Sequence, residues 1–382
     1  MASPVGPQTV VHPTQAGTSA RASQSWRRYL KDILWATRLT VSAVVLLAGR
    51  AWPSFRHQLA CLIVLTILVW PVRSVRWGTL YNFFVLGFFF TFPIVGLQYF
   101  IEKILWGGHS LVLGSVLVAP LTEEIGKILP LVLLLAIGRL GFRNSYGACD
   151  LMLCGAALGA GFGLFESSVR LTTSFPTPSS PGLLGIAIFP DSYNGFIGHS
   201  GSTALIGLSL GCLLYAVRWR RWLLPGIGGL LFASSWMMID HGVSNYATFG
   251  SEHSWFFPIR WIWALDRHGE LSPDVFLILI VATLVVERIL LWRLLRGYPR
   301  LPVASCFEFI RRPLRQGWGY PQLRAVVLRL RSLSLYVLSY RQLAFLLIHW
   351  KGDLPPNKTV FGPLIARQTG KVAASQLAVR QS

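Results

Sequence analysis

The sequence predicts an all-α membrane protein, a polytopic bundle of about eight transmembrane helices with a cytoplasmic amphipathic segment at the C-terminal end. Of its 382 residues, 53% are hydrophobic and only 13% are charged, about half the charged fraction of a soluble domain. Apolar runs recur at lengths close to the roughly 20 residues that a helix needs to cross a bilayer. The five cysteines are an odd number and indicate no disulfide framework.

Eight apolar runs have the length and composition of transmembrane spans. They are residues 33–49, 58–72, 80–100, 117–137, 149–167, 196–216, 222–245 and 275–291. The first run carries Arg38 and the second is short, which leaves open whether both cross the membrane. Residues 1–28 are rich in Pro, Thr, Gln and Ser and lack the order of a signal peptide. We expect a disordered terminus there and a transmembrane bundle over residues 29–295.

Basic residues are distributed unevenly over the connections between these spans. Arginines follow the second, fourth, sixth and eighth spans, whereas the other connections hold few. By the positive-inside rule this alternation predicts a multi-pass protein of the plasma membrane with both termini in the cytoplasm. The net charge is +20, and the basic residues that produce it follow this pattern. Attraction to anionic lipid therefore explains the charge better than binding to nucleic acid.

Residues 296–382 are predicted to form a basic cytoplasmic tail. Within it, residues 321–350 mix Leu and Val with several arginines. This pattern is typical of a helix that lies on the inner leaflet and contacts anionic lipid. A ninth span is the alternative, although Arg341 interrupts the apolar run.

Four of the predicted spans carry polar groups inside otherwise apolar runs. The groups are Glu123 and Glu124 with Lys127, Glu166 with Phe162, His199 with Thr203, and His241 with Asn245. Residues three or four apart share one face of a helix, so each group forms a polar stripe. Ionisable side chains at bilayer depth are costly and are typical of functional sites.

The predicted orientation places the four groups at one depth. Glu123 lies roughly 9 Å below the outer end of its span, at 1.5 Å per residue. Glu166 lies at the outer end of the next span, and His199 and His241 lie about one turn from the outer ends of theirs. A structural interpretation fits each motif alone, such as a hydrogen-bonded histidine. Their common depth favours one shared polar site in the outer half of the bilayer.

These motifs, in this order, resemble those of the PrsW family of intramembrane proteases. The matching stretches are residues 119–127, 161–166, 198–203 and 241–245. They lie within a catalytic core at residues 111–246. One departure is Ser167, because the family often has Asn after the second-motif glutamate. The related CAAX prenyl proteases and Abi proteins carry Arg in the first motif and His in the second, so Lys127 and Glu166 favour the PrsW branch.

The resemblance implies hydrolysis of a peptide bond in a membrane-anchored protein, such as an anti-sigma factor, near the extracytoplasmic face of a bacterial cell membrane. Hydrolysis needs an activated water, and a carboxylate in an apolar site is a suitable general base. Glu123 is our candidate for that base, with Glu124 and Lys127 setting its charge and position. No organic cofactor is expected.

Two mechanisms remain open. In the first, His199, His241 and Glu166 hold a zinc ion, because two histidines and one carboxylate with an open position form a catalytic zinc site. In the second there is no metal, His199 positions the water, and His241 with Asn245 stabilises the oxyanion. In either case Asp240 orients the His241 imidazole or is a plain interfacial carboxylate.

The alternative function is a proton-coupled membrane transporter, since carriers also bury Glu, His and Lys inside helix bundles. A transporter is expected to show repeat-related halves, whereas the polar groups here crowd into four consecutive spans. A further alternative is an inert scaffold whose basic tail binds a cytoplasmic partner.

Overall fold

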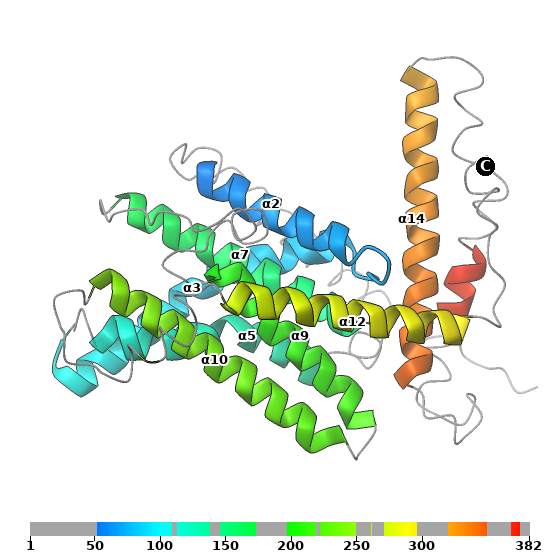
Figure 1. Cartoon of the computed structure of the whole chain (residues 1–382). Helices are drawn as coiled ribbons and strands as arrows, with labels where there is room; N and C mark the ends of the chain where they lie inside the picture. The colour runs from blue at the N-terminus through cyan, green and yellow to red at the C-terminus, as the bar shows by residue number, and fades with distance from the viewer. Residues whose placement is uncertain are drawn as a thin grey trace, which may run out of the picture. The chain divides into compact units, whose positions relative to one another are not determined.

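Helices are the only regular elements in the described part of the chain. The computed structural model describes residues 52–108, 113–137, 146–172, 197–218, 222–249, 261, 271–295, 320–349 and 368–374. The principal helices, labelled in Figure 1, are α2 (Trp52–Leu68), α3 (Trp77–Trp106), α5 (Ala119–Ile137), α7 (Ala148–Thr172), α9 (Gly198–Arg218), α10 (Leu223–Phe249), α12 (Leu271–Leu295) and α14 (Tyr320–His349). A π-helix, η1 (Gly114–Val118), leads directly into α5.

Five of the described helices are long and apolar enough to cross a membrane, namely α3, α7, α9, α10 and α12. The apolar part of α2, Gln58–Leu68, is shorter. Helix α5 contains three ionisable residues within its 19 residues, which lowers its apolar character. The predicted span at residues 33–49 lies outside the described residues. The all-α class and the multi-pass membrane topology are therefore confirmed, and the number of eight spans stays a prediction.

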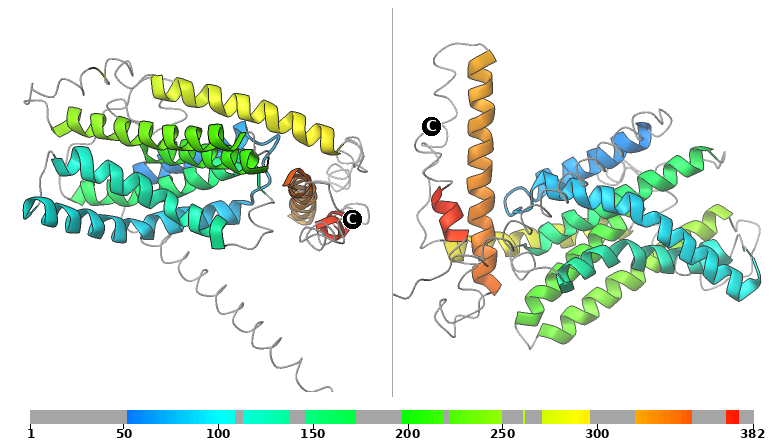
Figure 2. Two further views of the ribbon diagram at one scale, coloured as in Figure 1. Left: turned by 90° about the horizontal axis from the view of Figure 1, so that it is seen from below. Right: turned by 180° about the vertical axis from the view of Figure 1, so that it is seen from behind.

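Helix α7 packs against α9, α3 and α2 (Figure 1 and Figure 2). Glycines on α7 allow this close approach, as is common between membrane helices. A Cβ atom at Gly159 would overlap the backbone carbonyl of His199 on α9, and one at Gly161 would overlap that of Phe84 on α3. These two glycines therefore set how closely α7, which carries the second motif, approaches α9, which carries the third motif, and α3.

This packing predicts a clear difference between two glycine substitutions. We expect Gly161→Ala to lower the free energy of unfolding by about 1–3 kcal/mol, because the methyl group would push α7 away from α3. In the matched control, Gly96→Ala, the new Cβ has no neighbour within 4 Å, so we expect a change within about 1 kcal/mol, towards higher stability. Thermal unfolding of both variants in the same detergent would measure the difference. Equal destabilisation would contradict the packing described.

Two buried carboxylates hold the N-terminal end of α7. Asp150 accepts hydrogen bonds from the backbone N–H groups of Ser74 at 2.7 Å and Val75 at 2.8 Å, and from the Ser74 hydroxyl at 2.5 Å. Glu287 of α12 accepts from the Ala148 N–H at 2.5 Å and from the Tyr215 hydroxyl at 2.6 Å. Both carboxylates thus satisfy backbone donors at or beside a helix N-terminus, and they join four separate segments there.

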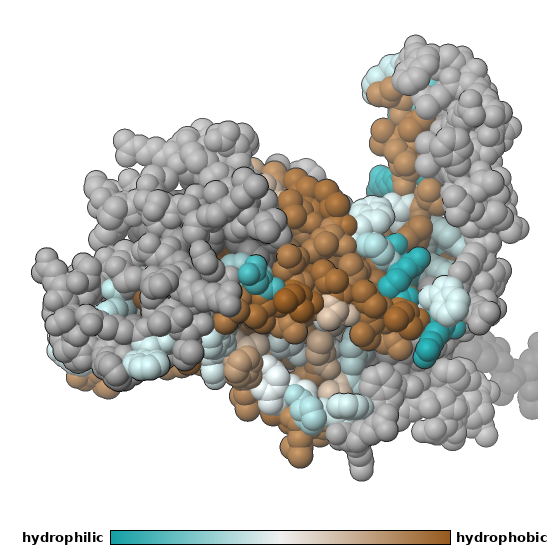
Figure 3. Space-filling model, viewed as in Figure 1, coloured by the Kyte–Doolittle hydropathy of each residue, from teal (hydrophilic) through white to brown (hydrophobic). Residues whose placement is uncertain are grey.

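Helix α14 forms where the sequence predicts an amphipathic segment. In the views of Figure 1 and Figure 2 it runs across the direction of the other helices. Its later residues are buried, including Phe345, which lies beside Gly147 at the start of α7. On the face shown in Figure 3, hydrophobic residues cover much of the described surface, and polar residues gather near α14. The position of α14 relative to the lipid leaflet stays a prediction.

Candidate active site

The four polar motifs lie on four different helices, α5, α7, α9 and α10, and their side chains meet. Glu124, Lys127, His199 and His241 are buried, and each contacts at least one of the others. Helix periodicity within each motif and the antiparallel course of successive spans bring these groups to one level of the bundle. The shared site expected from the common depth is thus present as a cluster of contacts.

The π-helix η1 shapes the entry to the first motif. A π-helical turn widens the helix and is frequent at functional sites. The Asn245 side-chain amide on α10 donates a hydrogen bond to the Ser115 carbonyl of η1 at 2.8 Å. Gly242 permits the approach, because a Cβ atom there would lie 2.6 Å from the Val116 carbonyl oxygen. Asn245 thus ties α10 to η1, and its expected part in stabilising an oxyanion stays a prediction.

Glu124 is the centre of a buried charge network. Lys127 donates to its Oε1 atom at 2.5 Å, one turn along α5. His241 Nδ1 lies 3.1 Å from the same oxygen, so the ring donates from Nδ1 to the carboxylate. This bond fixes the His241 tautomer and turns the lone pair of Nε2 towards Glu123. The carboxylate that orients His241 through Nδ1 is therefore Glu124, and a part for the neighbouring Asp240 stays a prediction.

His199 lies between a cation and a carboxylate. Lys127 Nζ is 2.9 Å from its Nδ1 atom, and Glu166 contacts its Nε2 atom through Oε2. Because an ammonium group only donates, Nδ1 is the acceptor and Nε2 carries the proton that goes to Glu166. The Phe162 ring covers this pair, at 4.9 Å from the His199 ring and 5.1 Å from Lys127 Nζ.

Glu123 faces both histidines. Its Oε2 atom lies 4.0 Å from His199 Nδ1 and 3.9 Å from His241 Nε2. One ligand atom from each of Glu123, His199 and His241 lies within 4.8 Å of the other two. The structure thus groups Glu123, and not Glu166, with the two histidines. The physical reason is that Glu166 bonds the opposite nitrogen of His199, on the side of the ring that faces away from Glu123.

This donor set fits a zinc ion. One carboxylate and two imidazoles are typical of catalytic zinc sites, and the Glu124 hydrogen bond to His241 is the kind of support that metal-bound histidines receive. Lys127 occupies Nδ1 of His199, so its ammonium group has to move before that nitrogen can bind a cation. The same three residues also suit a metal-free site in which the imidazoles flank a carboxylate.

Sequence reasoning missed two contacts beside the cluster. Ser200 donates to the Gln58 side-chain carbonyl at 2.5 Å and thereby connects α2 to α9 next to His199. The Ser115 carbonyl accepts the hydrogen bond from the Asn245 amide. It is a backbone group, so the sequence gives no sign of this contact. Gln58 is a polar residue at the start of an apolar run, and that was the available signal. Thr203 packs against α7, since a Cβ atom at Gly155 would overlap its carbonyl.

Comparison with known proteins places these motifs in a family. A family model described as PrsW family intramembrane metalloprotease matches residues 75–265, which is half of the chain and includes all four motifs. Searches of curated proteins and of solved structures find no match. The family match and the apolar helices agree on a membrane-embedded peptidase. The chain belongs to the PrsW family of intramembrane metalloproteases.

Proposed function

We propose that this protein hydrolyses a peptide bond of a membrane-anchored protein, such as an anti-sigma factor, near the extracytoplasmic face. The observation that carries the proposal is the convergence of Glu123, His199 and His241 from three helices on one buried point. Hydrolysis inside a membrane needs a water held by polar groups in an apolar surrounding, and this cluster offers such a place.

Glu123 has the central role in this proposal. Without a metal, its carboxylate takes a proton from the attacking water, and the imidazole of His199 positions that water. With a metal, Glu123, His199 and His241 are the residues that hold it. A zinc ion bound there would lower the pKa of its water and polarise the substrate carbonyl. The donor set and the family membership support the second form.

The remaining residues support these groups. Glu124 and Lys127 form a buried pair that balances the charge beside Glu123. Glu166 holds the Nε2 proton of His199 and so keeps Nδ1 turned towards the cluster. Asn245 is a positioning residue that holds α10 against η1. We assign the catalytic core to residues 111–246 on this basis.

We further propose that both termini lie in the cytoplasm of a bacterial cell and that the basic tail after residue 296 contacts anionic lipid. The alternating arginines support this orientation. Arg324 and Arg331 of α14 are exposed and available to a charged surface.

Cleavage by the purified protein tests the proposed function. The full chain and a tagged single-span substrate are reconstituted in vesicles, and the fragments are mapped by mass spectrometry. We expect a cut within the substrate span or at its extracytoplasmic end, and none with Glu123→Gln. A transporter would instead collapse a solute gradient in the same vesicles and leave every substrate whole, and that result would overturn the proposal.

A further inference from the structure

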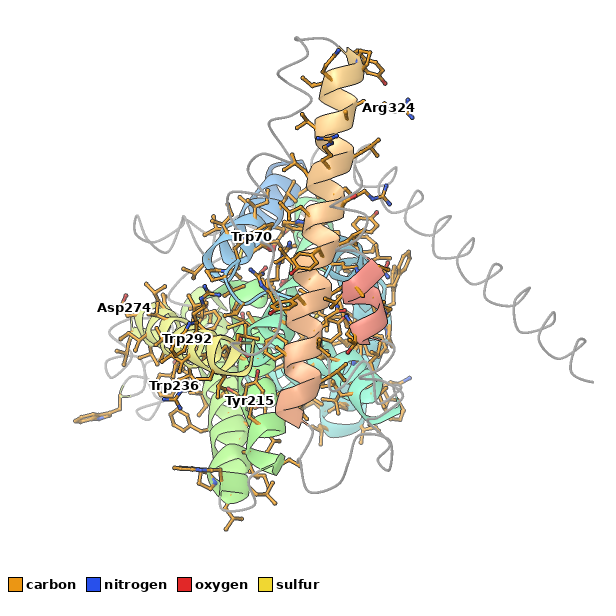
Figure 4. All side chains as sticks on the ribbon, turned by 90° about the vertical axis from the view of Figure 1, so that its right-hand side faces the viewer. Trp70, Tyr215, Trp236, Asp274, Trp292 and Arg324 are labelled. Carbon is orange, nitrogen blue, oxygen red and sulfur yellow. The ribbon has the colours of Figure 1, made fainter. Side chains whose placement is uncertain are left out.

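A cavity of about 520 Å³ lies between α14 and the turn that joins α2 to α3. It is lined by Trp70, Arg73, Leu330, Arg331, Leu333, Ser334, Val337, Leu338 and Arg341. This volume is in the range of small-molecule sites. In Figure 4, Trp70 lies near the middle of α14, and Arg324 lies towards the N-terminal end of that helix. The catalytic cluster contributes none of the lining residues.

Arg73 is the unusual member of this lining. Its side chain is only 1% exposed, and its Nε and Nη1 atoms have no hydrogen-bond partner among the described residues. The guanidinium lies over two indole rings, 4.6 Å from the centre of that of Trp70 and 5.2 Å from that of Trp77. Stacking stabilises the cation but leaves its donors unsatisfied, and such donors are costly when buried.

Two further arginines face the same space, and no acidic residue lines it in the described part of the chain. Arg341 donates to the carbonyls of Trp70 at 2.5 Å and Arg73 at 2.7 Å. Asp150, whose charge acts on Arg73 and Arg341 from outside this lining, already accepts hydrogen bonds from Ser74 and Val75. Burial lowers the pKa of Arg341 to about 10, and repulsion from Arg288 and Arg73 adds to this against the pull of Asp150. The described lining of the cavity therefore holds three arginines and no carboxylate.

A phosphate group supplies the negative charge and the charged hydrogen-bond acceptors that the lining side chains of this cavity lack. Guanidinium groups bind phosphate through paired, charge-assisted hydrogen bonds, and the planar fork of Arg suits this geometry better than Lys. Bound phosphate would give the Nε and Nη1 donors of Arg73 acceptors and would offset the repulsion between Arg73 and Arg341. Ser334 adds a hydroxyl to the same wall.

The surroundings favour a lipid as the source of the phosphate. The cavity lies by the N-terminal end of α7, and Asp150 there is about 24 Å from Glu166 along the helix axis, so it belongs to the opposite membrane surface from the catalytic cluster. Trp70, which lines the cavity, is 49% exposed, as in an interfacial aromatic belt. Leu330, Leu333 and Val337 give the cavity apolar walls that acyl chains can contact.

We propose that the cavity between α14 and the α2–α3 turn binds the phosphate of an anionic phospholipid, with Arg73 and Arg341 at its inner end and Arg331 at its rim. This site is more specific than general attraction of a basic tail to a charged surface, because its central residue comes from the bundle. The lipid also connects α14 to the bundle. The proposal is independent of the catalytic chemistry, since binding is measured without cleavage.

The test is a binding titration of the purified, delipidated full chain with dioctanoyl phosphatidylglycerol, read by native mass spectrometry. We expect saturable binding of one lipid per chain. Arg331→Gln, at an exposed position on α14, should weaken it by about tenfold through loss of one charge-assisted contact. The matched control is Arg324→Gln, which removes the same charge from the same helix away from the cavity and should change affinity by less than about twofold.

Further arms separate the alternatives. Arg73→Lys keeps the charge but loses the planar guanidinium group that can form paired hydrogen bonds with phosphate, so it should also weaken binding. Equal weakening by Arg324→Gln and Arg331→Gln, or binding that never saturates, would reduce the effect to diffuse attraction and overturn the site. Inorganic phosphate that binds as tightly as the lipid would assign the cavity to a soluble anion and overturn the lipid as its source. If Arg73→Lys fails to fold, the difference in lipid affinity between Arg331→Gln and Arg324→Gln still tests the proposed site.

Discussion

Glu123→Gln is expected to reduce kcat/KM for cleavage of a single-span substrate by about a thousandfold or more, because it removes either the base or a metal ligand. The amide is the same size as the carboxylate, and Oε2 faces both histidines at 3.9–4.0 Å, so packing should be preserved. An amide neither takes a proton from water nor binds zinc well. Initial rates in vesicles, with the thermal unfolding of the variant measured alongside, separate lost chemistry from lost structure.

The matched control for this prediction is Asp274→Asn. Asp274 is an exposed carboxylate in the first turn of α12, so the substitution makes the same chemical change outside the buried cluster. We expect its rate to stay within about twofold of the wild type. A Glu123→Gln variant that folds and still cleaves at a comparable rate would remove Glu123 from the mechanism.

Metal binding is expected to depend on Glu123, His199 and His241 and to survive the loss of Glu166. Replacing His241 with Ala should weaken zinc binding by about a thousandfold or more, since a ligand is lost. Glu166→Gln replaces the charged partner of His199 Nε2 with a neutral amide, and such outer hydrogen bonds are worth about 10–100-fold in metal affinity. Metal analysis of the purified protein and zinc titration of the chelated protein measure both effects.

Activity measured in parallel distinguishes the two mechanisms. If the metal form is used, a chelator should abolish cleavage and zinc should restore it. If active protein contains no metal and a chelator has no effect, Glu123 acts as a base without a metal. If Glu166→Gln abolishes zinc binding as completely as His241→Ala does, the ligand set is the one containing Glu166, and the grouping with Glu123 is wrong.

The sequence predicted the site residues better than their partners. Glu124 and Lys127 are three residues apart, so helix geometry alone indicates their contact. The positive-inside rule, applied without reference to the polar motifs, indicated the level at which His199 and His241 meet the glutamates. Which glutamate joins the histidines depends on ring orientation, and this is set by contacts between helices distant in sequence. Periodicity carries no information about such contacts.

The same limit applies outside the cluster. Arg73 is one of the arginines to which the sequence assigns only a positive-inside role, and the packing of α14 makes it part of the wall of a cavity. Asn245 shares a helix face with His241 as expected, yet its amide reaches a backbone carbonyl in a π-helix that the sequence did not predict. Backbone acceptors have no sequence signature, so their partners are found only from coordinates.

By itself, the sequence determined that the chain is a helical membrane protein, which polar residues are the candidates for its chemistry, and that they share one level of the bundle. These properties follow from hydrophobicity, charge and the 3.6-residue period, which act locally along the chain. The tertiary structure alone decided which atoms face one another: Glu123 with both histidines, Glu166 with the far nitrogen of His199, and Arg73 with α14. Those contacts depend on the separations and rotations of packed helices, which glycines such as Gly159 and Gly161 fix through contacts between distant segments.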